Sequence, residues 1–131
     1  MKISWLISAA VVAMATISLP AAHADNSTIP TWMFSSRDHL LQDRQELLED
    51  RTECTLRLTK LEGVRRQCDT MLNDSTITKP QHDALISWRT DASDHINALR
   101  SWKDEIDSDL MDNDNALRYL EDKMKRWACI K

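Results

Sequence analysis

The scarcity of glycine and proline constrains this chain more than any other feature. Residues 25–131 contain one glycine, Gly63, and two prolines, Pro30 and Pro80. Sheets need frequent tight turns, and tight turns use glycine, proline and asparagine in number. A chain with so few turn-forming residues is suited to long helices, so we predict an all-α fold.

An apolar repeat of seven residues supports a helix over about residues 36–73. The repeating positions are Leu40, Leu47, Cys54, Leu61 and Cys68. A second row, four residues further on, is apolar at Leu58 and Leu72 but elsewhere carries arginine. One good row beside one poor row predicts a helix with coiled-coil character.

A second helical region is expected after a break at residues 73–79. Thr78 and Gln81 have the spacing of a capping box, and Pro80 falls in the first helical turn. An apolar seam then continues at spacings of mostly three and four: Leu85, Trp88, Ala92, Ile96, Leu99, Trp102, Ile106, Leu110, Leu117, Leu120, Met124 and Trp127. This spacing is typical of a packed helix.

Asn113 occupies a seam position where an apolar residue is expected. In one interpretation the chain turns back there, giving helices over about 79–111 and 115–129 and a three-helix bundle. In the other, a single helix continues through residue 113, and the fold is an elongated antiparallel helical hairpin. A polar residue in such a seam can fix the register of two helices at a cost in stability.

The first 24 residues have the pattern of an export signal. Lys2 precedes an uncharged apolar block, Pro20 ends it, and Ala22-His23-Ala24 has the form of a cleavage site. We predict cleavage after Ala24 and a periplasmic or secreted protein. The alternative is an uncleaved weak anchor over residues 3–19, shorter than the roughly 20 apolar residues of a spanning helix. The protein would then sit at the inner membrane, facing the periplasm and touching the bilayer through its N-terminus.

The remaining chain is expected to be one small domain. Residues 25–35, which contain an apolar Trp-Met-Phe group at 32–34, are predicted to be a linker, and residues 36–131 the helical domain. Removing residues 1–24 takes away only Lys2 among the charged residues, so 16 basic and 21 acidic side chains leave a net charge of −5. This balance argues against nucleic acid or anionic lipid as the main partner.

Three cysteines, Cys54, Cys68 and Cys129, are disulfide candidates, because export places them in an oxidising compartment. In a straight two-helix hairpin Cys54 faces about residue 99, and Cys129 has no cysteine opposite it. A turn at residue 113 would instead bring Cys54 level with Cys129. In a parallel homodimer, Cys54 and Cys68 could each bond to their own copies. A protein partner, most simply a second copy, is therefore expected.

The sequence offers no recognisable catalytic or metal-binding pattern. His39, His82 and His95 lack a paired metal spacing, and no Cys-x-x-Cys, glycine-rich phosphate loop or nucleophile elbow occurs. Long thin helices also offer little concave surface for a substrate. We therefore predict a non-enzymatic protein without a metal or other cofactor.

Three tryptophans, Trp88, Trp102 and Trp127, are candidates for a partner surface, because tryptophan is enriched where proteins bind one another. Helical spacing also fits the alternative that they pack in the core. Trp127 lies beside Lys125 and Arg126, which is compatible with a lipid interface or with the end of the bundle.

In layout, the chain resembles the inner-membrane spanins of phage lysis cassettes. The features that carry the resemblance are the export or anchor segment, the charged coiled-coil body, the near-terminal Cys129, and Cys54 or Cys68 as an internal cysteine. The resemblance implies a disulfide-linked helical dimer that crosses the periplasm and disrupts the outer membrane together with a partner there. The cleavage pattern at Ala24 departs from an anchored spanin.

Ile77-Thr78-Lys79-Pro80-Gln81 is similar to a degenerate form of the Leu-Thr-x-x-Gln motif of small periplasmic stress chaperones. That resemblance implies a soluble helical dimer that binds other proteins. A third hypothesis is a periplasmic inhibitor or immunity protein. The run of acidic residues between Asp104 and Asp114 is compatible with that role, since it could face a basic partner.

Overall fold

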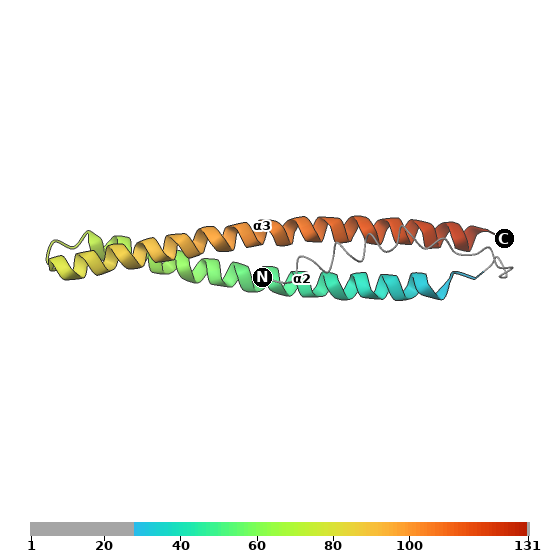
Figure 1. The fold of residues 1–131 in the computed structure, drawn as a ribbon, viewed down its shortest axis with the longest axis horizontal. Helices are drawn as coiled ribbons and strands as arrows, with labels where there is room; N and C mark the ends of the chain where they lie inside the picture. The colour runs from blue at the N-terminus through green and yellow to red at the C-terminus, as the bar shows by residue number, and fades with distance from the viewer. Residues whose placement is uncertain (1–27, 131) are drawn as a thin grey trace. The chain divides into compact units, whose positions relative to one another are not determined.

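Two long helices make up the fold, as a computed structural model that describes residues 28–130 shows (Figure 1). Helix α2 spans Thr31–Leu72 and helix α3 spans Lys79–Cys129. The helices pack against each other as an antiparallel hairpin, and the described residues contain no strand. The predicted all-α fold is confirmed.

Helix α3 runs without a break through Asn113, so the hairpin forms and the three-helix bundle does not. Helix α2 begins at Thr31, which makes the linker prediction wrong for residues 31–35. Pro30 directly precedes the helix, and its carbonyl oxygen accepts a hydrogen bond of 3.0 Å from the amide of Met33. Met33, seven residues before Leu40, is only 2% exposed. The heptad row therefore starts one repeat earlier than predicted, and burying Met33 favours the extra helical turn.

The turn between the helices is closed by short-range hydrogen bonds. The Asp74 carboxylate accepts bonds from the Thr76 amide at 2.9 Å and the Thr76 hydroxyl at 2.7 Å. These bonds hold the pKa of Asp74 below its usual value. The Gln81 side chain accepts from the Thr78 amide at 2.9 Å, and the Gln81 amide donates to the Thr78 hydroxyl at 3.4 Å. The predicted capping box at the start of α3 is confirmed.

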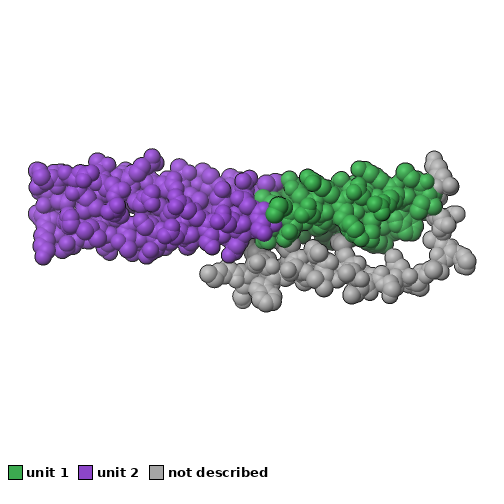
Figure 2. All heavy atoms as spheres, turned by 90° about the horizontal axis from the view of Figure 1, so that it is seen from above, with its two compact units in different colours: residues 1–46, 109–131 green, residues 47–108 purple. Residues whose placement is uncertain are grey.

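Two compact units divide the hairpin, and each contains part of both helices (Figure 2). The described residues of unit 1 are 28–46 and 109–130, and unit 2 comprises Leu47–Ser108. The core of unit 1 is a cluster of five buried side chains: Met33, Leu40, Leu117, Leu120 and Met124. Unit 2 buries Leu47, Cys54, Cys68, Leu85, Ala92, Ile96 and Ile106.

Heptad letters describe the seam within each unit. In α2, position d is held by Met33, Leu40, Leu47, Cys54, Leu61 and Cys68, and position a by Arg37, Arg44, Arg51, Leu58, Arg65 and Leu72. In α3, position d is held by Leu85, Ala92, Leu99, Ile106, Asn113, Leu120 and Trp127, and position a by Arg89, Ile96, Lys103, Leu110, Leu117 and Met124. Position e borders a, and position g borders d. In an antiparallel pair, the two e rows form one edge and the two g rows form the other.

One register describes both units. In unit 2 the Cys54 thiol donates to the main-chain oxygen of Leu99 at 3.2 Å, and in unit 1 the Asn113 amide donates to that of Leu40 at 2.9 Å. Leu40 lies 14 residues before Cys54 in α2, and Asn113 lies 14 residues after Leu99 in α3, so both pairs fit the same register. The prediction that Cys54 faces about residue 99 in a straight hairpin is confirmed.

Candidate protein-contact surface

Four ion pairs between the two helices lie on the edge formed by the e rows. In unit 2, salt bridges join Arg51 to Asp107 at 2.8 Å, Arg100 to Glu62 at 3.1 Å, and Arg89 to Asp69 at 2.7 Å. In unit 1, Arg44 pairs with Asp114. Each bridge joins e to e or a to e. We call this side the ion-pair edge.

Arginines at position a explain why this edge is charged. Arg44, Arg51 and Arg89 occupy seam positions, but their long side chains reach outward to carboxylates while their stems cover the seam. The paired groups are roughly one-third to one-half exposed. Each pair therefore adds little to stability, since exposed ion pairs contribute about 0–1 kcal/mol. The ion pairs therefore match particular side chains of α2 and α3 to each other but contribute little to the stability of the fold.

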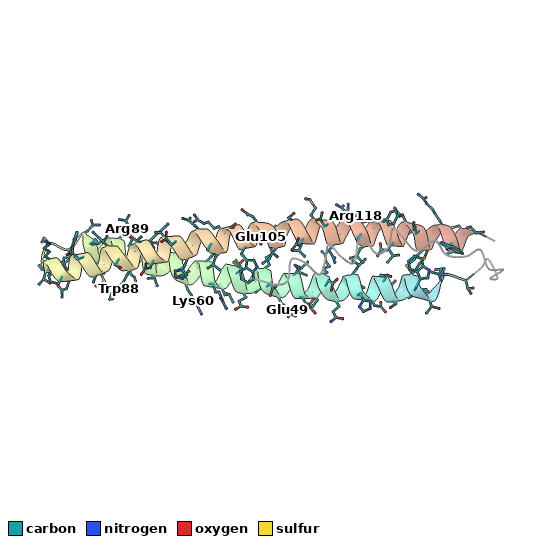
Figure 3. The ribbon with its side chains drawn as sticks, viewed as in Figure 1. Glu49, Lys60, Trp88, Arg89, Glu105 and Arg118 are labelled. Carbon is teal, nitrogen blue, oxygen red and sulfur yellow. The ribbon has the colours of Figure 1, made fainter. Side chains whose placement is uncertain are left out.

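The opposite edge of unit 2, formed by the g rows, carries four apolar side chains together with Asp50, Arg57 and His95. We call it the Trp edge and define it by Val64 and Met71 of α2 and Trp88 and Trp102 of α3. Trp88 is 60% exposed, and Val64 and Met71 are also exposed. In Figure 3, the Trp88 and Arg89 side chains leave α3 on different sides. A large exposed indole among other apolar groups is typical of a surface that binds another protein.

The structure corrects the predicted seam at Trp88. Its spacing from Leu85 and Ala92 fits a seam, yet the core position beside it belongs to Arg89. Because a pattern of apolar residues excludes arginine, the sequence predicted Trp88 at the seam position that Arg89 occupies. Trp102 is half-buried on the same edge. Exposure makes Trp88, with Trp102 beside it along the helix, the better supported of the predicted partner residues.

Trp127 has a different role from Trp88. It is half-buried and packs against the core cluster of unit 1, together with Ile29 and Ala116. Its basic neighbours Lys125 and Arg126 are exposed. The position of Trp127 in unit 1 therefore fits packing at the end of the bundle, one of the two alternatives given for it.

The three cysteines do not come together. Cys54 and Cys68 are buried at seam positions, and Cys129 is exposed at the end of α3, so all three are free thiols. Burial is the main cause that raises the pKa of Cys54, against the opposing charges of Lys103 and Arg57. A Cys54–Cys129 disulfide needed a turn at residue 113, which α3 does not make. Disulfides between copies through Cys54 or Cys68 would require this hairpin to open, because both thiols face the seam.

Asn113 forms a polar layer in unit 1. Its side chain is 1% exposed and donates to the Leu40 carbonyl, whereas its own Oδ1 has no hydrogen-bond partner. Such a group is costly to bury, by about 1–3 kcal/mol. The continuous helix with a polar core position, one of the two sequence interpretations, is the one the structure contains.

A shallow groove of about 500 Å³ also lies on the ion-pair edge of unit 2. It is lined by Arg65, Asp69, Ile86, Arg89, Thr90 and Ser93. Asp69 already pairs with Arg89, and the described groups with shifted pKa, Cys54 and Asp74, do not line the groove. Across residues 28–130, no three metal-ligating side chains gather into a site. Over the same range, no helix is long and apolar enough to cross a bilayer.

Residues 1–27 lie outside the described structure, so the predicted cleavage after Ala24 and the anchor over residues 3–19 stay predictions. The chain matches no protein family, no curated protein and no solved structure.

Proposed function

We propose that this chain is a non-enzymatic, exported coiled-coil protein that acts in the periplasm through protein–protein contacts, with the Trp edge as its contact surface. The main observation behind this proposal is that the two edges of unit 2 present different side chains. One edge carries three ion pairs, with Leu48 36% and Ile86 44% exposed beside them, and the other exposes Trp88 60%, Met71 51% and Val64 43%. Exposing so large an apolar side chain is unfavourable in water, and a bound protein would cover it.

The surface test places a photo-cross-linking amino acid at residue 88 in cells that express the full chain. Position 90 is the matched control, because Thr90 is exposed on the same helix but at position b, away from the Trp edge. We expect protein adducts from residue 88 and few from residue 90. Equal yields at the two positions, or no adduct at residue 88, would contradict the proposed surface.

Export has its own test, in which cells are fractionated and the N-terminus of the protein is sequenced. We expect either a periplasmic protein that begins at Asp25 or an uncleaved protein in the inner membrane that a protease can reach from the periplasm. A full-length protein confined to the cytoplasm would refute export. A soluble protein that begins at Asp25 would support export and rule out the anchored form.

A spanin-like role in phage lysis is the finer form of this proposal. The helical hairpin and the exposed thiol of Cys129 support it, since an exposed thiol can form a disulfide with a second copy. In a phage that encodes this chain, deleting the gene should then block disruption of the host outer membrane at lysis. Normal bursting without the gene would exclude this role and leave the broader proposal in place.

The alternative roles draw less support from individual residues. Thr78 and Gln81, which carry the resemblance to periplasmic chaperones, bond to each other as a helix cap. Within the acidic run that suggested an inhibitor or immunity protein, Asp107 and Asp114 already pair with Arg51 and Arg44. Local structure therefore accounts for the chaperone-like motif and for part of the acidic run.

A further inference from the structure

One side of unit 1, at the end away from the turn, carries aromatic and basic side chains and no acidic ones. The c and g rows of both helices share this side, because position c borders position g. Within the two helices, the last residues of these rows are Trp32, Ser36 and His39 of α2 and Ala116, Tyr119, Lys123 and Arg126 of α3. We call Trp32, Tyr119, Lys123 and Arg126 the end patch.

The aromatic members of the end patch lie at nearly the same level of unit 1. By the register that sets Leu40 against Asn113, Trp32 lies two residues, about 3 Å along the axis, from the level of Tyr119. Trp32 is 40% exposed and Tyr119 is 61% exposed. The Lys123 Nζ lies 4.6 Å from the centre of the Tyr119 ring, in a cation–π contact. Large amphipathic rings and positive charges therefore share one surface.

The other side of unit 1 has a balanced charge at this end. Its b and e rows carry the basic Arg118 and Lys125 and the acidic Asp38 and Glu121. Asp122, at position f between the two sides, pairs with Lys125 at 4.0 Å. The end patch is therefore locally positive, in a chain whose residues 25–131 carry 16 basic and 21 acidic side chains.

Acidic side chains mark where this positive surface stops. Further towards the turn, the same c and g rows of unit 1 hold Asp43, Glu46, Asp109 and Asp112. Asp112 lies seven residues before Tyr119, about 10 Å along the axis, which is close to the distance over which physiological salt screens a charge. A negatively charged surface would attract the end patch and repel these acidic residues, so unit 1 would meet such a surface at its end.

We propose that the end patch binds the surface of a bilayer that contains anionic phospholipid. Trp32 and Tyr119 lie at the level of the headgroups, where tryptophan and tyrosine are enriched because their rings have an apolar body and a polar tip. Lys123 and Arg126 contact the lipid phosphates, to which the negative potential of the surface attracts them. This contact does not depend on the Trp edge of unit 2, so a failure of either proposal leaves the other standing.

The chain before α2 places a membrane within reach of the end patch. The apolar residues 3–19 of the predicted anchor are separated from residue 28 by eight residues, which span at most about 28 Å. If residues 3–19 stay in the bilayer, they hold unit 1 near the membrane by the end that carries the patch. If the signal is cleaved, the end patch supplies the membrane contact alone.

A fluorescent reporter on the purified, exported protein tests where the contact lies, whether or not residues 3–19 bind the vesicles as well. In a Cys129→Ser background, an environment-sensitive dye is attached to Ser36→Cys, on the side of the end patch, or to Asp38→Cys, exposed on the other side. With mixed phosphatidylglycerol–phosphatidylcholine vesicles, we expect a blue shift of the emission from residue 36 and none from residue 38. Shifts at neither position, or equal shifts at both, would overturn the proposal.

The same reporter at residue 36 tests the role of charge. The lipid concentration at half the shift should rise about fivefold in Lys123→Gln and in Arg126→Gln, and in an anchored protein the shift itself should shrink. Arg118→Gln is the matched control, since it removes the same charge from the other side of α3 and should change the result less than about twofold. Circular dichroism should show unchanged helix content in all three variants.

Two results would overturn the use of anionic lipid. One is an equal shift with vesicles of phosphatidylcholine alone, which lack net charge. The other is a shift that the Lys123→Gln and Arg126→Gln substitutions together leave unchanged. A shift that weakens as salt is raised would support the proposal, because salt screens the attraction between the end patch and the lipid phosphates.

Discussion

The side chain of Asn113 shows how one polar residue can serve structure at the expense of stability. Its amide reaches the Leu40 carbonyl across the seam, but its Oδ1 is buried without a partner. The Leu40 carbonyl lies inside α2, where the amide four residues ahead is its regular helical partner. Losing the bond from Asn113 would therefore not leave that carbonyl unpaired. Asn113 gains one hydrogen bond across the seam, and a polar residue at such a position can favour one register at a cost in stability.

Replacing Asn113 with leucine should stabilise the protein by about 1–3 kcal/mol, because it removes a buried unpaired oxygen and adds apolar contact. Urea denaturation monitored by circular dichroism measures the change. Asn115→Leu is the control, since Asn115 is exposed two residues further on and should change stability by less than about 0.5 kcal/mol. A loss of stability in Asn113→Leu would show that the amide bond outweighs the unpaired oxygen.

Cys54 should give the protein an alkaline instability. Its thiol is 0% exposed, and burial raises its folded-state pKa above the ordinary value of 9.0. The unfolded thiol therefore ionises first as the pH rises, and the stability that depends on the neutral thiol is full below pH 9 and declines above it. We expect the advantage of wild type over Cys54→Ala to shrink between about pH 9 and the raised folded-state pKa. A constant difference in unfolding free energy from pH 7 to pH 10 would contradict this.

Helix α2 in unit 2 contains several features that weaken a helix locally. The hydroxyl groups of Thr52, Thr55, Thr59 and Thr70 each donate to the carbonyl four residues earlier. Such bonds slightly destabilise helices and often bend them. Gly63 lies in the same stretch and adds the entropy cost of a residue without a side chain. Packing against α3, more than intrinsic propensity, therefore holds this part of α2 in place.

Gly63→Ala should raise stability by about 1 kcal/mol, the ordinary difference between these residues inside a helix. A methyl group built at Gly63 would meet nothing within 4 Å, and the residue has no positive φ. The space around Gly63 therefore does not require a glycine there. Urea denaturation measures the gain, and Gln67→Gly, at an exposed helical site, should lose a similar amount. A destabilised Gly63→Ala would reveal a need for glycine.

The two helices and the turn between them could be predicted because each has a local signal, whereas the start of α2 at Thr31 was missed. The prediction of the turn depends on the capping residues Thr78 and Gln81. The prediction that Cys54 faces residue 99 follows from counting residues outward from that turn. Whether α3 continues at Asn113 could not be decided, because a polar core residue and a turn look alike in sequence. The Trp edge could not be located either, because arginine at position a, as at Arg89, hides the true seam.

At the scale of the whole molecule, the thiols should react in two classes. In the native protein one thiol, Cys129, should react quickly with an aromatic disulfide reagent, and all three should react in denaturant, because Cys54 and Cys68 are buried. Cys129→Ser should abolish the fast reaction. A Cys54–Cys129 linked peptide in a non-reducing digest would contradict the hairpin as described.

The shared register of the two units has a kinetic consequence. Paired residues lie further apart in sequence the further they are from the turn: 45 residues separate Cys54 from Leu99, and 73 separate Leu40 from Asn113. Closing a longer loop costs more entropy. We therefore expect the two helices to pair first near the capped turn and the contacts of Asn113 to form late in folding. Asn113→Leu should therefore slow unfolding in stopped-flow experiments and leave the folding rate nearly unchanged. Stability gained far from the turn would then lengthen the lifetime of the folded chain without making it fold faster.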